Sequence, residues 1–278
     1  MKRGARLGQH FLNAVWVARD LVAAVAPRPH DIIVEVGPGR GALTEKLLAT
    51  GNMVVAIEKD ETLAAFLLEK FANEIANGKL HLMQGDIRDG DTYDVLAGRP
   101  YVVAANIPYY ITGEIIRDFL TAAHQPQKMA LLIQKEVADR IVARDKKESI
   151  LSLSVKAYGE PSIVAKVPAG CFNPPPSVDS AILLVKNISR TFFADISEET
   201  FFAVVKAGFA SKRKQLGGNL GKVFGEVALG ALDACAISPR IRAEDLSLDE
   251  WQRLTTSISA IPLENQYVSP ESPQPEKD

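Results

Sequence analysis

Apolar runs of strand length alternate with amphipathic segments along the first half of the chain, and this alternation limits the possible folds most strongly. Strands are predicted at 31–37, 53–58, 79–86, 101–106 and 128–134, and helices at 41–51, 61–76, 113–123 and 135–143. Strands that are apolar throughout are typical of a parallel sheet with helices on both faces. The first half of the chain is therefore predicted to form a Rossmann-like α/β domain.

The second half has a different pattern. Two strand-like runs, at 150–159 and 180–186, are separated by a proline-rich loop with no helical pattern, so we expect an antiparallel pair that closes the mostly parallel sheet with an antiparallel last strand. From Ser197 onward the pattern is helical, at 197–210, 222–234 and 247–259, which indicates a small C-terminal all-α domain. The predicted boundaries are 1–190 for the α/β domain, 191–262 for the helical domain and 263–278 for a disordered acidic tail.

Composition excludes several classes of protein. No apolar run approaches the roughly 18 residues of a membrane span, and the N-terminal segment lacks the apolar stretch of a signal peptide. The two cysteines have neither the spacing of a metal site nor that of a disulfide framework. We therefore expect a cytoplasmic protein without a membrane contact or a bound metal.

The net charge of −2 does not by itself indicate a nucleic-acid-binding protein, but two segments are locally basic. Neither residues 1–19 nor residues 200–225 contain an acidic side chain, so both can bind phosphate or can simply be solvated. The candidate RNA-binding residues are Arg3, Arg6, Lys206, Lys212, Arg213, Lys214 and Lys222.

The first predicted strand ends in a glycine-rich turn that indicates a nucleotide site. Gly37, Gly39 and Gly41 allow a sharp turn and a close approach to a ligand before a helix begins. Glu58 ends the second strand, where a carboxylate can accept hydrogen bonds from ribose hydroxyls, and Asp86 follows the third.

Two cofactors are compatible with this turn, NAD and S-adenosylmethionine. The spacing G-x-G-x-G differs from the G-x-G-x-x-G of NAD sites, and Glu35 lies just ahead of the turn. An acid at that place suits a cationic sulfonium ligand better than a diphosphate. The pattern favours S-adenosylmethionine, and NAD remains the alternative.

The fourth strand ends in Asn-Ile-Pro-Tyr, residues 106–109, at the edge where ligands bind in such sheets. The lone pair of an adenine amino group is delocalised into the ring, so the amine must be held by acceptors to become a useful nucleophile. Asn106 can supply one acceptor and a backbone carbonyl near Pro108 the other, while Tyr109 offers a face on which a base can stack. A simple turn is the alternative interpretation.

Six motifs occur in a fixed order, namely GQHFL, VEVGPGRGALT, AIEKD, GDI, NIPY and CFNPPPSVDSAI, and they begin at residues 8, 34, 56, 85, 106 and 171. In these motifs the chain resembles the ribosomal RNA adenine N6,N6-dimethyltransferases of the KsgA type, over about Leu7 to Leu254. The resemblance implies a Rossmann-like S-adenosylmethionine-dependent methyltransferase sheet followed by a small helical domain. It also implies a donor site formed by His10, Leu12, Gly37, Gly39, Glu58, Asp86, Ile87 and Asn106.

Asn106 and Pro108 are thus the candidate residues that hold the target amine, and the resemblance implies further that Tyr109 and Phe172 enclose the adenine. His10 departs from the family pattern, which usually has asparagine there, so its contact can come from the side chain or from the backbone. The expected activity is dimethylation of N6 of two adjacent adenosines in the 3′-terminal hairpin of small-subunit rRNA. The expected substrate is the rRNA or a pre-30S particle, and the enzyme is expected to be a monomer.

Three other functions compete with this one. A methyltransferase that acts on a large-subunit adenine and confers antibiotic resistance shares the GQ-x-FL and N-x-PY motifs. An RNA-binding assembly factor without catalysis would not need Asn106, Pro108 and Tyr109 together. A dehydrogenase would bind NAD at the glycine turn.

Overall fold

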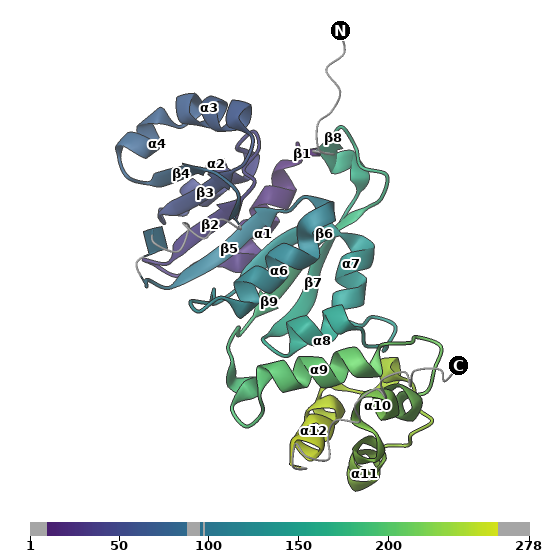
Figure 1. Cartoon of the computed structure of the whole chain (residues 1–278). Helices are drawn as coiled ribbons and strands as arrows, with labels where there is room; N and C mark the ends of the chain where they lie inside the picture. Colours follow the sequence, from purple (N-terminus) through teal and green to yellow (C-terminus); the bar gives the residue numbers. More distant parts are fainter. Residues whose placement is uncertain (1–9, 88–94, 97, 261–278) are drawn as a thin grey trace, which may run out of the picture. The chain divides into compact units, whose positions relative to one another are not determined.

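The computed structural model describes residues 10–87, 95, 96 and 98–260 and divides into two compact units (Figure 1). The first unit takes in the chain up to Val142 together with Ser154–Ser189, and the second takes in Ala143–Leu153 and the chain from Arg190. The segment Ala143–Leu153, from within the predicted 1–190 domain, is thus grouped with the helical unit. The predicted tail at 263–278 lies outside the described residues.

A seven-stranded sheet forms the centre of the first unit, with the order β4-β3-β2-β5-β6-β9-β7. All neighbouring strands are parallel except that β9 runs antiparallel to both β6 and β7. A Rossmann-like sheet with an antiparallel last strand is therefore confirmed. The strands are β2 (Ile32–Val36), β3 (Val54–Glu58), β4 (Leu80–Gln84), β5 (Tyr101–Asn106), β6 (Met129–Gln134), β7 (Glu160–Val167) and β9 (Ser180–Lys186).

The prediction of a strand at 150–159 is wrong. This segment forms helix α8 (Ile150–Lys156), and the strand that pairs with β9 is β7, further along the chain. Ser149 begins the helix, because its hydroxyl accepts a hydrogen bond from the Ser152 amide at 3.1 Å. Strand β7 lies at the sheet edge with alternating exposed residues and contains Pro161, so it lacks the apolar run by which a buried strand is recognised.

Helices cover the sheet on both faces. Helices α1 (Val15–Val25), α2 (Ala42–Leu48) and α3 (Glu61–Lys70) share one hydrophobic cluster with alternate residues of the central strands. The remaining residues of those strands are also buried, and α6 (Thr112–Thr121) and α7 (Lys135–Ile141) lie on the other face (Figure 1). Helix α1 is not among the helices predicted from the sequence, and the segment predicted as one helix at 61–76 divides at Phe71 into α3 and α4 (Ala72–Ala76).

A second, two-stranded sheet joins the start of the described chain to the proline-rich loop before β9. Strand β1 (Phe11–Leu12) pairs antiparallel with β8 (Phe172–Asn173), with Leu12 opposite Phe172. The pairing holds Phe11 and Leu12 of the GQHFL motif against the start of the CFNPPP motif, although about 160 residues separate them in the chain.

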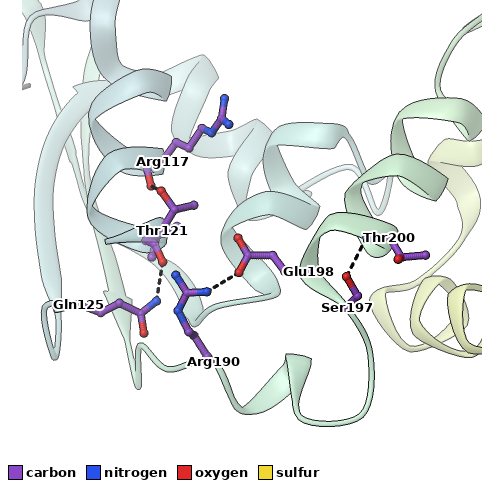
Figure 2. A network of polar contacts seen from close by, with 8 residues as sticks. Arg117, Thr121, Gln125, Arg190, Ser197, Glu198 and Thr200 are labelled. Atoms are coloured by element: carbon purple, nitrogen blue, oxygen red, sulfur yellow. Dashed lines mark hydrogen bonds and ion pairs between the residues drawn. The ribbon is translucent and has the colours of Figure 1, made fainter. Parts of the chain in front are cut away.

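The second unit contains the start of α8 and helices α9 (Glu198–Gly208), α10 (Leu216–Phe224), α11 (Glu226–Ala234) and α12 (Leu248–Ser259). Ser197 caps α9 by accepting from the Thr200 amide, and Arg190 pairs with Glu198 in the first turn (Figure 2). Ser247 and Glu250 form a capping box on α12. Gly225, at φ 57°, separates α10 from α11 within the segment predicted as one helix.

Gly208 lets α9 approach Trp251 closely, and this packing stabilises the helical unit. A Cβ atom at position 208 would overlap the Trp251 ring and lie 3.0 Å from Leu216 Cδ1. We expect Gly208→Ala to lower the free energy of unfolding by about 1–3 kcal/mol, as overpacking does. Gly218→Ala is the matched control, because its Cβ would meet no atom within 4 Å; it should leave stability unchanged or raise it slightly. Urea unfolding of both variants tests this, and equal stabilities would contradict it.

Candidate functional site

A cavity of about 500 Å³ opens at the carboxyl ends of the parallel strands, the expected place for a ligand in this fold. It lies within the first unit. Five chain segments line it, namely residues 10–12, 35–43 without Gly41, 57–62, 85–87 and 106–111. All the predicted donor-site residues therefore line one cavity, and so do Pro108 and Tyr109.

The glycine-rich turn after β2 requires its glycines for conformation and for packing. Gly37, Gly39 and Gly41 have φ of 67°, 60° and 79°, a region that other residues rarely adopt. A Cβ on Gly41 would lie 2.6 Å from the Phe71 ring. The turn is thus narrow because α2 must begin close to the end of α3. The narrow turn places its own backbone at the cavity wall.

Glu58 fixes the shape of this turn. One carboxylate oxygen accepts a hydrogen bond from the Gly39 amide at 3.0 Å and the other from the Asp60 amide at 2.9 Å. Each oxygen has a second lone pair, so the buried carboxylate can still accept from the hydroxyls of a ligand.

Glu35 is the second buried carboxylate of the cavity, with a side chain only 1% exposed. The Thr44 hydroxyl donates a hydrogen bond to it at 2.7 Å. Burial raises the pKa of Glu35 to about 8, the Thr44 hydrogen bond opposes the shift, and the charge of Glu58 adds to it. A cationic ligand group in the cavity would stabilise the ionised form, so Glu35 fits the ammonium of an amino-acid tail.

Asp86 lies at the end of β4 and pairs with Lys59 at 2.9 Å. The lysine side chain is largely exposed, whereas that of Asp86 is mostly covered. The Asp86 carboxylate is therefore held at the cavity wall by the flexible Lys59 side chain, and solvent weakens the attraction between the two charges.

Asn106 is oriented by a backbone group of the N-terminal segment. Its amide nitrogen donates to the His10 carbonyl at 3.3 Å, which leaves the side-chain oxygen without a partner among the described residues. The Pro108 carbonyl already accepts from the Ile111 amide and the Thr112 hydroxyl. The Ile107 carbonyl has no such donor in the described part of the chain, so it is the better candidate for the second acceptor.

Tyr109 is held at both ends of its side chain. Its hydroxyl hydrogen-bonds the buried Ser180 hydroxyl at 2.7 Å, and its ring stacks on His10 with centroids 5.8 Å apart. Burial raises the pKa of the Tyr109 hydroxyl. The ring is therefore fixed and neutral, as a stacking surface for a base should be.

His10 lines the cavity, whereas Phe172, also expected at the site, does not. The His10 side chain donates from Nδ1 to the Pro174 carbonyl at 2.8 Å, while its backbone carbonyl holds Asn106. Phe172 is 3% exposed in the hydrophobic cluster beneath the sheet face and does not line the cavity. Its predicted contact with the target base stays a prediction that requires the ring to leave this cluster.

The basic residues predicted in the helical unit are exposed and form no ion pair within the described residues. They are Lys206, Lys212, Arg213, Lys214 and Lys222. Asn219 shapes the loop that carries three of them, because its buried amide donates to the carbonyls of Gly208 and Ser211. Arg3 and Arg6 lie outside the described residues.

Two cavity residues, Phe11 and Arg40, were not predicted as site residues; they form a cation–π pair at 4.6 Å beside Gly39. Ser180, which holds Tyr109 from outside the cavity lining, was not predicted either. Phe11 and Ser180 lie inside motifs that the sequence did show, but their contacts depend on β1 and β9 reaching the same edge. No group of side chains suited to a metal, and no helix able to cross a membrane, occurs in the part of the chain that the structure describes.

The raised pKa of Glu35 predicts a pH dependence of stability. Between about pH 4.5 and 8 the folded protein retains a proton on Glu35 that the unfolded chain has lost, so stability falls as the pH rises, by at most about 1.4 kcal/mol per unit. Glu35→Gln removes this effect. The melting temperature of Glu35→Gln minus that of the unmodified protein should increase from pH 5 to pH 8. Glu69→Gln, at an exposed position on α3, is the control. A constant difference across this range would contradict the assignment.

Comparisons with known proteins agree with this arrangement. Residues 2–260 match the family "Ribosomal RNA adenine dimethylase". The ribosomal RNA small subunit methyltransferase A of Dehalococcoides mccartyi (strain CBDB1) is 41% identical over 94% of this chain and 90% of its own length. That of Synechococcus elongatus (strain ATCC 33912 / PCC 7942 / FACHB-805) is 36% identical over 91% and 94%.

Two solved structures show the same fold. A dimethyladenosine transferase from Plasmodium falciparum has a TM-score of 0.75 at 24% identity, covering 88% of this chain and 96% of its own. The 23S rRNA methyltransferase ErmE has a TM-score of 0.72 at 22% identity, covering 90% and 99%. The family resemblance inferred from the six motifs is thereby confirmed: the chain belongs to the ribosomal RNA adenine dimethylase family.

Proposed function

We propose that this enzyme transfers methyl groups from S-adenosylmethionine to N6 of two adjacent adenosines in the 3′-terminal hairpin of small-subunit rRNA. The observation that carries the proposal is a pair of acceptors at the end of β5 to which no described residue donates, the Asn106 side-chain oxygen and the Ile107 carbonyl. They lie in the cavity that also holds Glu35 and Glu58. Two acceptors fit the two N–H bonds of an exocyclic amine.

The donor supplies an electrophilic methyl group on a sulfonium, and the cavity residues suit the rest of that molecule. Glu58 would accept from the ribose hydroxyls, as Glu35 would from the ammonium group. Asp86 and Ile87 would contact the adenine of the donor, and His10, Leu12, Gly37 and Gly39 would complete the wall. The buried neutral form of Glu35 fits this assignment, because a cationic partner is what would allow it to ionise.

The residues of this chain would act by positioning the target amine relative to the methyl group of the donor. With both N–H bonds held, the nitrogen is favoured in a more tetrahedral form, and its lone pair points at the methyl group. Most of the acceleration would come from this alignment, since the product cation loses its proton readily. After one transfer a single N–H remains, so the base must turn to present it for the second transfer.

The helical unit supplies exposed cations that would bind rRNA phosphates. Lys212, Arg213 and Lys214 follow one another in the loop before α10 and have no acidic partner in the described residues. We expect a monomer that acts in the cytoplasm on rRNA or on a pre-30S particle. The N-terminal Arg3 and Arg6 are proposed to add to the same interaction with rRNA.

A large-subunit methyltransferase is the main alternative, because the ErmE structure shares the fold. The fold alone does not separate the two substrates. The relatives with 36–41% identity over nearly the whole chain are named for the small subunit, and this favours the proposed substrate. The acceptors around Asn106 argue against a factor that only binds RNA, and Glu35 beside the glycine turn argues against NAD.

The test uses the pure protein, labelled S-adenosylmethionine and particles of each ribosomal subunit that lack the modification. We expect label in the small subunit alone, and mass spectrometry of the rRNA should show dimethyladenosine at two neighbouring positions. Asn106→Ala should lower the rate at least about 100-fold while RNA binding stays nearly unchanged. Asn73→Ala, at an exposed asparagine of α4, is the matched control. Label only in the large subunit, or a fully active Asn106→Ala variant, would refute the proposal.

The basic loop gives a prediction for binding. Replacing Lys212, Arg213 and Lys214 together by alanine should weaken rRNA binding and lower the slope of log affinity against log salt by about 0.7–0.9 for each phosphate that the variant no longer binds. Because the three side chains are exposed, the melting temperature should not change. Lys79→Ala, at an exposed lysine of the first unit, should leave the slope unaltered. Filter binding at several salt concentrations measures it, and an unchanged slope in the triple variant would exclude these phosphate interactions.

A further inference from the structure

Two consecutive tyrosines follow Pro108, and their environments are opposite. Tyr109 is fixed by Ser180 and His10, as described above. Tyr110 lines the same cavity but is 65% exposed, and its side chain makes no hydrogen bond or ring contact with any described residue. An aromatic ring at the mouth of a site with both faces unpaired is available to a ligand.

The local backbone sends the two rings to different sides. Tyr109–Ile111 form a 3-10 turn, in which successive side chains point about 120° apart. With Tyr109 directed to the buried Ser180, Tyr110 is directed away from that residue while still bordering the cavity. The turn is stabilised by the Ile111 amide, which donates to the Pro108 carbonyl at 3.2 Å. The backbone positions from which both tyrosine side chains project are therefore fixed.

The proposed reaction requires an aromatic surface beside the cavity on which a base can stack. An adenine that enters the cavity must leave its stack, and the nucleotide next to it then loses a stacking partner. Aromatic side chains replace base stacking without regard to sequence, because every base has a π face. On the basis of the proposed function, we propose that Tyr110 is a second base-binding residue, on which the nucleotide adjacent to the target adenine stacks while Tyr109 holds the target.

This assignment explains why a large apolar ring is exposed beside a site that must otherwise recognise a charged polymer. It also links the site to its substrate. A target with an adjacent purine gives Tyr110 the larger stacking surface, and each of two neighbouring adenosines would serve as the other's stacked neighbour during its own transfer.

The test combines protein variants with altered RNA. The substrates are a hairpin with two adjacent adenosines and two hairpins in which the nucleotide on one side of a single target adenosine is abasic. The proteins are the unmodified enzyme, Tyr110→Ala, Tyr110→Phe and Phe66→Ala, the last being a control at an exposed aromatic residue of α3 outside the cavity. Methylation of the target adenosine is followed by mass spectrometry.

We expect Tyr110→Ala to lower kcat/KM for the intact hairpin about tenfold, mainly through KM for RNA. Tyr110→Phe should remain near the unmodified rate, because the ring and not the hydroxyl is required, and Phe66→Ala should have no effect. One of the two abasic hairpins should reduce kcat/KM of the unmodified enzyme by a similar factor. The same hairpin should cause no further loss in Tyr110→Ala, because the two changes remove one interaction.

Independent losses that multiply in Tyr110→Ala with the abasic hairpin would overturn the inference, as would an unchanged kcat/KM in Tyr110→Ala on the intact hairpin. Either result could occur with an active unmodified enzyme, so the proposed function would stand. Failure of the unmodified enzyme to methylate the intact hairpin or a pre-30S particle would instead overturn the proposed function and this inference together. Melting temperatures of the four proteins separate a folding defect from the absence of stacking.

Discussion

Burying a carboxylate without hydrogen-bond donors is costly, and Glu58 finds donors in the backbone that forms the site. Its two oxygens accept from the amides of Gly39 and Asp60, which belong to different turns at the same sheet edge. One side chain thus sets the distance between the glycine turn after β2 and the start of α3. The turn cannot relax outward without leaving one oxygen of the carboxylate unpaired, so the cavity wall is formed before any ligand arrives.

Glu35 shows what happens to a carboxylate at the same edge that lacks such donors. One hydroxyl hydrogen bond does not offset complete burial, and its pKa rises to about 8. The two acids therefore differ in role because of their environments and not because of residue type. Glu58, already paired with backbone amides, suits neutral hydroxyls. Glu35, short of partners, suits a positive charge, and that difference favours a sulfonium amino-acid ligand over a dinucleotide at this turn.

The parts of the structure that depend on a single local sequence pattern could be predicted from the sequence. The buried parallel strands, the glycine turn, Glu58 and the Asn106–Tyr109 segment all show in short stretches of chain, and the structure places the last three at one cavity. Prediction failed where the decisive contact is distant. Strand β7 is half exposed and is a strand because β9 lies beside it, whereas 150–159 is apolar and helical because Ser149 caps it. Helix α10 begins among glycines, because Leu216 and Gly217 donate their amides to Ile241 and Pro239.

The same distinction applies within the site. The position of Asn106 follows from the strand before it, but the direction of its amide follows from the carbonyl of His10, 96 residues earlier. His10 is in turn held by Pro174 and by the pairing of β1 with β8. The side chain at position 10 can therefore differ from the family pattern while the backbone contact to Asn106 is retained. A backbone carbonyl tolerates the exchange of asparagine for histidine, so the departure leaves the orientation of the Asn106 amide unchanged.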